Sequence, residues 1–79
     1  MIMNINISEI VKLGKSYLDG LEIENSKHES RLILSKEIKK SESEIILNNS
    51  LEISEKQKKN FLNNIYKRMQ GKPISRIFG

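Results

Sequence analysis

Apolar residues recur along this chain at the three-to-four-residue spacing of an α-helix, and this spacing most constrains its fold. No alternation of apolar and polar residues, the pattern of a half-buried strand, rivals this helical spacing. The pattern therefore predicts an all-α fold, a small bundle of four helices plus a short fifth, in which each helix buries one stripe. The first predicted stripe consists of Ile7, Ile10, Val11, Gly14, Tyr17, Leu18 and Leu21.

Capping residues divide this pattern into separate helices. Ser41 is followed three residues later by Glu44, and Ser54 by Gln57, which is the spacing of a capping box. The other predicted caps are Ser8 for the first helix and Asn25 or Ser26 for the second. The helices are predicted at residues 8–20, 27–38, 42–48, 55–70 and, for the short fifth, 73–78.

Two glycines indicate how these helices meet. Gly14 lies inside the first apolar stripe, where it predicts the close approach of another helix. Gly71 is predicted to end the long fourth helix in a left-handed conformation, and Pro73 suits the first turn of the next helix. We expect the short helix to pack its apolar side on the core. The expected core residues of the second, fourth and fifth helices are Leu32, Ile33, Leu34, Phe61, Leu62, Ile65, Met69, Ile74, Ile77 and Phe78.

The length and composition predict one small domain over residues 1–79, near the lower limit of what a single hydrophobic core can stabilise. There is no cysteine, no apolar run of membrane-spanning length and no signal peptide. A cytoplasmic protein with no membrane partner is the expectation from these features.

The charge is strongly asymmetric along the chain. Residues 1–55 hold seven Lys and Arg residues and all ten Asp and Glu residues, a net charge of −3. Residues 56–79 hold seven basic residues and no acidic one, a net charge of +7. Such a segment is suited to an acidic protein, an RNA or an acidic neighbouring domain, although a solvated lysine face has the same composition.

Catalytic chemistry is not indicated by the sequence. The single histidine, His28, has no cysteine or carboxylate cluster at ligand spacing, so we predict a surface or structural role and no metal. The four glycines stand apart and form no phosphate-binding loop. We therefore assign no catalytic residue and no cofactor-binding residue. Direct binding of nucleic acid is disfavoured because Tyr17 and Phe61 are predicted to be buried and unable to stack on bases.

Three stretches of the chain resemble the N-terminal domain of the release-factor glutamine methyltransferases, the HemK/PrmC family. The first is residues 29–34, an acid, a small residue, a charged residue and an aliphatic run; the second is residues 51–54, Leu-Glu-Ile-Ser. The most specific is residues 68–79, which is similar to the family's arginine-x-x-glycine-x-proline-aliphatic-x-x-aliphatic-x-glycine signature. The chain departs from the family at Arg76, where a Tyr or His ring is common.

The resemblance implies a recognition domain rather than a catalytic one. In the family, a second domain binds S-adenosylmethionine and methylates the glutamine of a Gly-Gly-Gln motif in peptide-chain release factors. The motif that holds this glutamine, Asn-Pro-Pro-Tyr, does not occur here, because Pro73 is the only proline. The resemblance therefore implies a domain excised from a longer methyltransferase whose catalytic domain follows residue 79. Its implied partners are the release factor and that catalytic domain.

Lys67, Arg68, Lys72 and Arg76 are the residues that we predict to bind the partner. Solvated charge, or a bond to the methyltransferase domain, would explain the same residues. Gly71, Pro73 and Gly79 are interpreted as architectural. Two other hypotheses come from different classes: a basic helical adaptor that binds RNA or the ribosome, and a small protein–protein interaction module complete at 79 residues.

Overall fold

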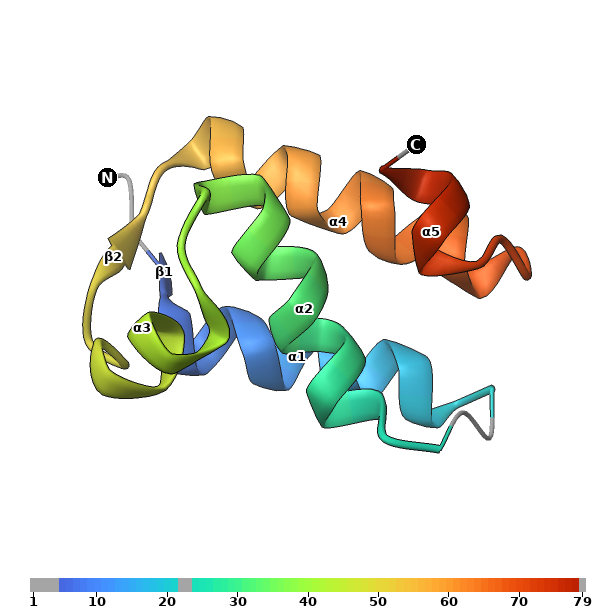
Figure 1. Cartoon of the computed structure of the whole chain (residues 1–79), viewed down its shortest axis with the longest axis horizontal. Helices are drawn as coiled ribbons and strands as arrows, with labels where there is room; N and C mark the ends of the chain where they lie inside the picture. Colours follow the sequence, from blue (N-terminus) through green and yellow to red (C-terminus); the bar gives the residue numbers. More distant parts are fainter. Residues whose placement is uncertain (1–4, 22–23, 79) are drawn as a thin grey trace.

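Five helices and one short pair of strands make up residues 5–21 and 24–78, the part of the chain that the computed structural model describes (Figure 1). The helices confirm the predicted all-α class, and each begins and ends within two residues of its predicted bounds. In chain order the elements are β1 (Ile5–Asn6), α1 (Ile7–Asp19), α2 (Ser26–Ile38), α3 (Glu42–Leu47), β2 (Glu52–Ile53), α4 (Glu55–Met69) and α5 (Ile74–Ile77).

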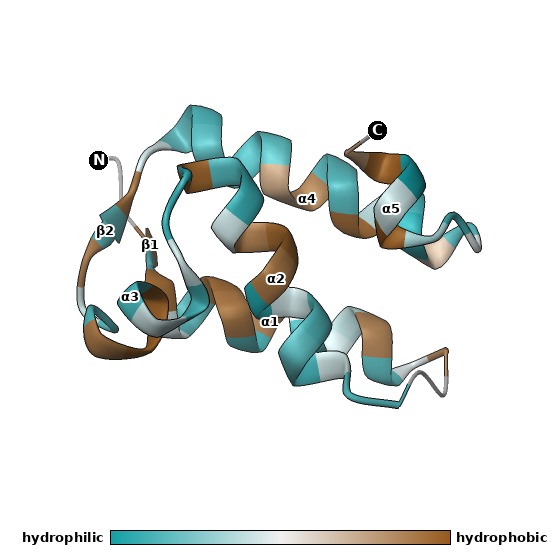
Figure 2. Cartoon of the chain, viewed as in Figure 1, coloured by the Kyte–Doolittle hydropathy of each residue, from teal (hydrophilic) through white to brown (hydrophobic). Residues whose placement is uncertain are grey.

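Three helices enclose the core. α1 and α4 run along opposite edges of the view, α2 packs on both of them, and α3 and α5 lie at the two ends (Figure 1). The apolar sides of these helices face the space between them (Figure 2). The buried apolar side chains are Ile7, Ile10, Val11, Leu18, Ile33, Leu34, Ile45, Ile53, Phe61 and Ile65.

At Gly14 the helices approach each other closely, as the sequence predicted. A Cβ atom placed on Gly14 would overlap Ser30 Oγ of α2 and would lie only 2.7 Å from Phe61 Cζ of α4. Ser30 is fully buried at this crossing, and its hydroxyl donates a hydrogen bond of 2.9 Å to the carbonyl oxygen of Val11. The hydrogen bond satisfies a polar group that would otherwise be costly to bury.

Two of the predicted helix starts are confirmed in detail. Ser41 and Ser54 both form capping boxes: each hydroxyl accepts from the third helical N–H, and Glu44 or Gln57 accepts from the backbone N–H of the serine. The predicted cap at Ser8 is wrong. Asn6 caps α1 instead, in a capping box with Glu9.

The start of α1 differs from the prediction because an unpredicted short strand, β1, precedes it and pairs with β2. β1 and β2 pair antiparallel, Ile5 opposite Ile53 and Asn6 opposite Glu52. The N–H of Ser8 donates to the carbonyl oxygen of Asn49 at 3.0 Å, beside this ladder. Ser8 is thus already within the helix. The short alternations Asn4-Ile5-Asn6-Ile7 and Leu51-Glu52-Ile53-Ser54 were the sequence signal for the two strands, and the longer helical pattern outweighed them.

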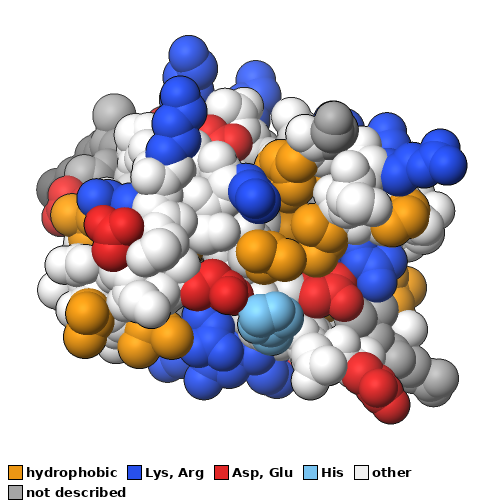
Figure 3. Space-filling view, viewed as in Figure 1, with side chains coloured by type: hydrophobic (Ala, Val, Ile, Leu, Met, Phe, Trp, Pro, Cys, Tyr) orange, Lys and Arg blue, Asp and Glu red, His pale blue; other side chains and the backbone are white. Residues whose placement is uncertain are grey.

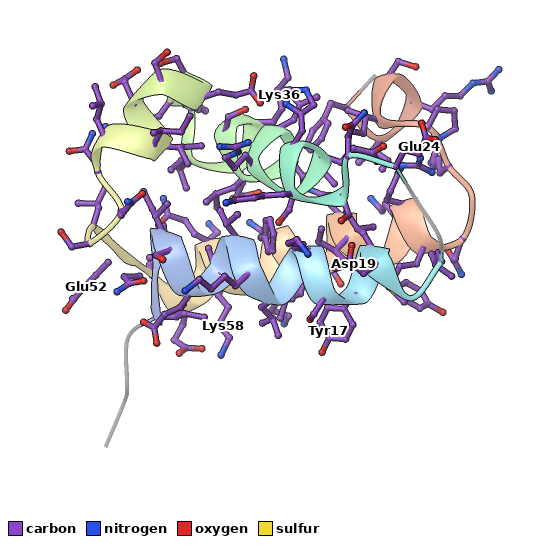
Figure 4. All side chains as sticks on the ribbon, turned by 90° about the horizontal axis from the view of Figure 1, so that it is seen from below. Tyr17, Asp19, Glu24, Lys36, Glu52 and Lys58 are labelled. Atoms are coloured by element: carbon purple, nitrogen blue, oxygen red, sulfur yellow. The ribbon has the colours of Figure 1, made fainter. Side chains whose placement is uncertain are left out.

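The predicted side-chain cap of α2 is also wrong. Asn25 adopts the left-handed conformation with φ at 61° and makes no capping hydrogen bond. Ser26 is buried, and its hydroxyl donates to the Asp19 carboxylate at the end of α1. Lys15 Nζ also donates a hydrogen bond of 2.6 Å to the Asp19 carboxylate, which is labelled in Figure 4. The hydrogen bond from Lys15, and to a lesser extent the one from Ser26, lowers the pKa of the Asp19 carboxyl below its ordinary value. α2 therefore begins with a side-chain bond back to α1.

Several residues that were predicted to be buried lie at the edge of their stripes. Tyr17, Leu21 and Phe78 are exposed, with 45%, 44% and 36% of their surface accessible. Leu32, Leu62, Met69, Ile74 and Ile77 are half-buried, in contrast to the fully buried Ile33 and Leu34. These helices therefore bury narrower faces than the sequence suggested. Gly79 lies outside the described residues.

No helix in the described part of the chain has the length and apolar character needed to cross a membrane.

Gly14→Ala is expected to destabilise the fold by about 1–3 kcal/mol, because the new methyl group overpacks the crossing against Ser30 and Phe61. Gly20→Ala is the matched control, since within the described part of the chain its Cβ would meet the carbonyl oxygen of Tyr17 alone, at 3.4 Å. Its backbone is already right-handed, so the control should leave stability unchanged or raise it by less than about 1 kcal/mol. Urea unfolding followed by circular dichroism measures both changes. Equal stabilities for the two variants would contradict the close crossing.

Candidate recognition surface

The turn between α4 and α5 is fixed by backbone bonds. Gly71 has φ at +91°, the left-handed conformation predicted for it, and its N–H donates to the carbonyl oxygen of Arg68 at 3.0 Å. Pro73 then precedes the first residue of α5, and its carbonyl oxygen accepts from Arg76 N–H at 2.9 Å. Residues 70–78 are therefore held in a defined conformation after α4.

Arg68, one of the four predicted partner-binding residues, is engaged within the domain. Its Nε lies 2.6 Å and its second guanidinium nitrogen 3.4 Å from the two carboxylate oxygens of Glu29 on α2. The side chains of Arg68 and Glu29 are only 22% and 18% exposed. This two-point ion pair joins α4 to α2, so the structure gives Arg68 a role in the fold, beside which its predicted partner-binding role remains a prediction.

The other three predicted residues, Lys67, Lys72 and Arg76, are exposed. Within the described residues, no carboxylate lies within ion-pair distance of any of them. They belong to the last turn of α4, the following turn and α5, so one corner of the molecule carries three positive charges that no described carboxylate pairs with. We call Lys67, Lys72, Arg76 and Phe78 the C-terminal corner.

An apolar hollow of about 410 Å³ adjoins this corner, between α2 and α5. It is lined by Leu32, Lys36, Ile74, Ser75 and Phe78. Apolar side chains gather over α2 and α5 on this face, with a positive side chain beside them (Figure 3). Sequence reasoning missed the hollow because it placed Leu32 and Phe78 in the core. The only signal was the spacing of Leu32 and Lys36, which puts both on one side of α2.

A second apolar groove of about 260 Å³ lies between α1 and α4. It is lined by Tyr17 and Tyr66, which is 60% exposed, together with Leu62, Ile65 and Met69. A lysine-rich depression next to it, lined by Glu55, Lys56, Lys58 and Lys59, shares Leu62 with the groove. Tyr17 and Lys58 point to the same side of the molecule, away from Lys36 (Figure 4). The two exposed tyrosines remove the main objection that the sequence raised against binding of nucleic acid.

His28 lies on the surface between α2 and α3. Its side chain is 54% exposed, and its Nδ1 is 3.1 Å from Glu42 Oε1. Within residues 5–21 and 24–78, no three His, Cys, Asp or Glu side chains come together in a way that could hold a metal ion.

Comparison with known proteins identifies one family. A family model described as the PrmC N-terminal domain matches residues 9–79, which span α1 to α5. No curated protein and no solved structure gave a significant match.

The ion pair between Arg68 and Glu29 is expected to stabilise the domain by about 1–2 kcal/mol, because two charge-assisted hydrogen bonds form away from bulk water. A double-mutant cycle of Arg68→Met and Glu29→Gln, measured by urea unfolding, gives this coupling energy. Lys67→Met, at the exposed neighbouring position, should change stability by less than about 0.5 kcal/mol. Additive effects of the two substitutions would show that the pair contributes nothing to the fold.

Proposed function

The chain belongs to the PrmC N-terminal domain family, and we propose that it is the substrate-recognition domain of a peptide-chain release factor glutamine methyltransferase. The family supports the methyltransferase and release-factor context. The observation that carries the recognition role is the C-terminal corner, where three exposed cations have no ion-pair partner in the described chain and Phe78 lines an apolar hollow.

The corner has the composition of a contact surface for an acidic protein. Unpaired Lys and Arg side chains at a rim accelerate encounter with an acidic partner and orient it. The adjoining hollow offers Leu32, Ile74 and Phe78 for apolar contact. Such a surface can bind the body of a release factor while the glutamine to be methylated lies elsewhere.

The rigidity of the corner is what makes it useful to catalysis. Binding energy obtained far from the reacting group can position a substrate only if the surface that supplies it is held in place. Here the left-handed Gly71 fixes the turn, and the pair between Arg68 and Glu29 fixes α4 on α2. The proposed role of this domain is thus to hold the release factor so that its glutamine meets the methyl donor.

We propose that the methyl donor, S-adenosylmethionine, binds outside the described part of this chain. Gly14 is enclosed between helices, Gly20 ends α1 and Gly71 stands alone in a turn, so the described glycines form no loop that could receive a nucleotide. We assign the cofactor and the methyl transfer to a separate catalytic domain, which is the second proposed partner. A cytoplasmic location, where release factors act, is part of the same proposal.

The proposal predicts that the chain binds the release factor of its own organism through the C-terminal corner. The triple substitution Lys67→Gln, Lys72→Gln, Arg76→Gln should weaken binding by about tenfold, because each exposed charge contributes a fraction of a kcal/mol. The matched control is Lys56→Gln, Lys58→Gln, Lys59→Gln, which removes the same net charge from the other end of α4. Isothermal titration calorimetry gives the three dissociation constants.

The control variant should bind within about twofold of the unaltered chain, a change of less than half a kcal/mol. Equal weakening by both triple substitutions would assign binding to net charge rather than to the corner. Absence of binding by the unaltered chain would overturn the recognition role and leave the helices to shape or stabilise the catalytic domain.

Binding of single-stranded RNA is a second candidate function, and the face carrying Tyr17 and Tyr66 favours it. Two exposed rings beside the lysine-rich depression provide both stacking surfaces and positive charge. Fluorescence anisotropy with labelled oligouridylate should then show binding that falls steeply with salt and is weakened by Tyr66→Leu. Binding that is insensitive to this substitution would remove the candidate.

A further inference from the structure

A pocket of about 180 Å³ between α1, α2 and α3 is lined by three basic side chains. Lys12 comes from α1, and Lys27 and Arg31 come from successive turns of α2. The rest of the lining is largely aliphatic and includes Ile45 and Ile46 of α3. The pocket therefore combines concentrated positive charge with apolar walls.

The positive charge in this pocket is not neutralised within the described residues. None of their carboxylates lies within ion-pair distance of Lys12, Lys27 or Arg31. Arg31 Nε is moreover buried and has no hydrogen-bond partner among the described residues. Buried donors are almost always satisfied in folded proteins, because an unsatisfied one costs about 1–3 kcal/mol. Arg68 of α4 differs in this respect, because its guanidinium donates hydrogen bonds to Glu29. Glu29 lies on α2, the helix that also carries Arg31.

The surface next to the pocket is apolar. Ile46 is 50% exposed and Leu47, the following residue, is 82% exposed. A group of Lys and Arg side chains lies beside apolar side chains on the lower left of the molecule (Figure 3). A ligand that satisfies both features must carry an anionic group and an aliphatic group within a few ångströms of each other.

We propose that this pocket binds an acidic segment of a partner protein, with a Glu or Asp carboxylate accepting hydrogen bonds from Arg31 and an adjacent aliphatic side chain contacting Ile46 and Leu47. A carboxylate matches the fork of a guanidinium, and the flanking lysines add attraction. A protein segment is favoured over RNA because no aromatic side chain lines the pocket, and the exposed tyrosines line another groove.

This site is separate from the C-terminal corner. α3 and α5 lie at opposite ends of the molecule (Figure 1). The inference does not depend on the proposed binding of a release factor, and its test uses a different ligand.

The test is a titration of the ¹⁵N-labelled chain with a capped peptide of alternating glutamate and leucine, followed by ¹H–¹⁵N correlation spectra. Saturable shifts are expected at the amides of Lys12, Arg31 and Asn49, which line the pocket. A peptide with glutamine in place of glutamate should bind at least about tenfold more weakly, since it lacks the charge. Equal binding of the two peptides, or no saturable shift, would overturn the proposal.

Arg31→Met removes the guanidinium and keeps most of the side-chain length. This substitution should weaken binding of the glutamate peptide by about tenfold or more. It should leave the melting temperature of the domain unchanged or raise it, because Arg31 Nε has no hydrogen-bond partner among the described residues. Replacing the exposed Lys12 and Lys27 together with glutamine should also weaken binding of the glutamate peptide. Lys59→Gln, at an exposed position outside the pocket, should leave this binding unchanged. Uniform effects of all these variants would show non-specific charge attraction. Tighter binding of oligouridylate than of the peptide at this pocket would assign it to nucleic acid.

Discussion

The close crossing of α1 with α2 and α4 at Gly14 is the constraint on which the rest of the structure depends. A side chain at this position would separate Ser30 and Phe61 from α1. The buried hydroxyl of Ser30 also needs the Val11 carbonyl oxygen, which is within reach only while the helices remain close. The crossing sets where α4 lies on α2, and so whether Arg68 can meet Glu29 and where the C-terminal corner stands. The proposed recognition surface thus rests on contacts at the centre of the bundle.

Much of the fold could be predicted from local chemistry. The capping boxes at Ser41 and Ser54 and the left-handed Gly71 depend on interactions within a few residues, and the structure confirms all three. The start of α1 could not be predicted, because it depends on pairing with the distant connector at residues 49–53. Ser26 matched a capping residue by type, but its hydroxyl binds Asp19 instead. Which capping residue a helix uses therefore depends on the residues that pack beside its first turn as well as on the local sequence.

The candidate site was predictable in its charge but not in its arrangement. Composition alone located the basic segment. It could not show that Arg68 forms an ion pair with Glu29, which lies 39 residues earlier in the chain. Periodicity assigned Tyr17 and Phe78 to the core, although both are exposed. The reason is physical: a 79-residue domain encloses little volume, so residues at the edge of an apolar stripe remain at the surface. Those edge residues line the hollow and the groove that the proposals use.

The most direct test of the recognition role is to map the surface that a release factor touches. The unlabelled release factor would be added to the ¹⁵N-labelled chain, and the loss or shift of each amide signal recorded. The account predicts that the largest changes fall at Lys67, Lys72, Arg76 and Phe78, with little change along the face that carries Tyr17 and Tyr66. Changes confined to the tyrosine face, or none at saturating release factor, would contradict it.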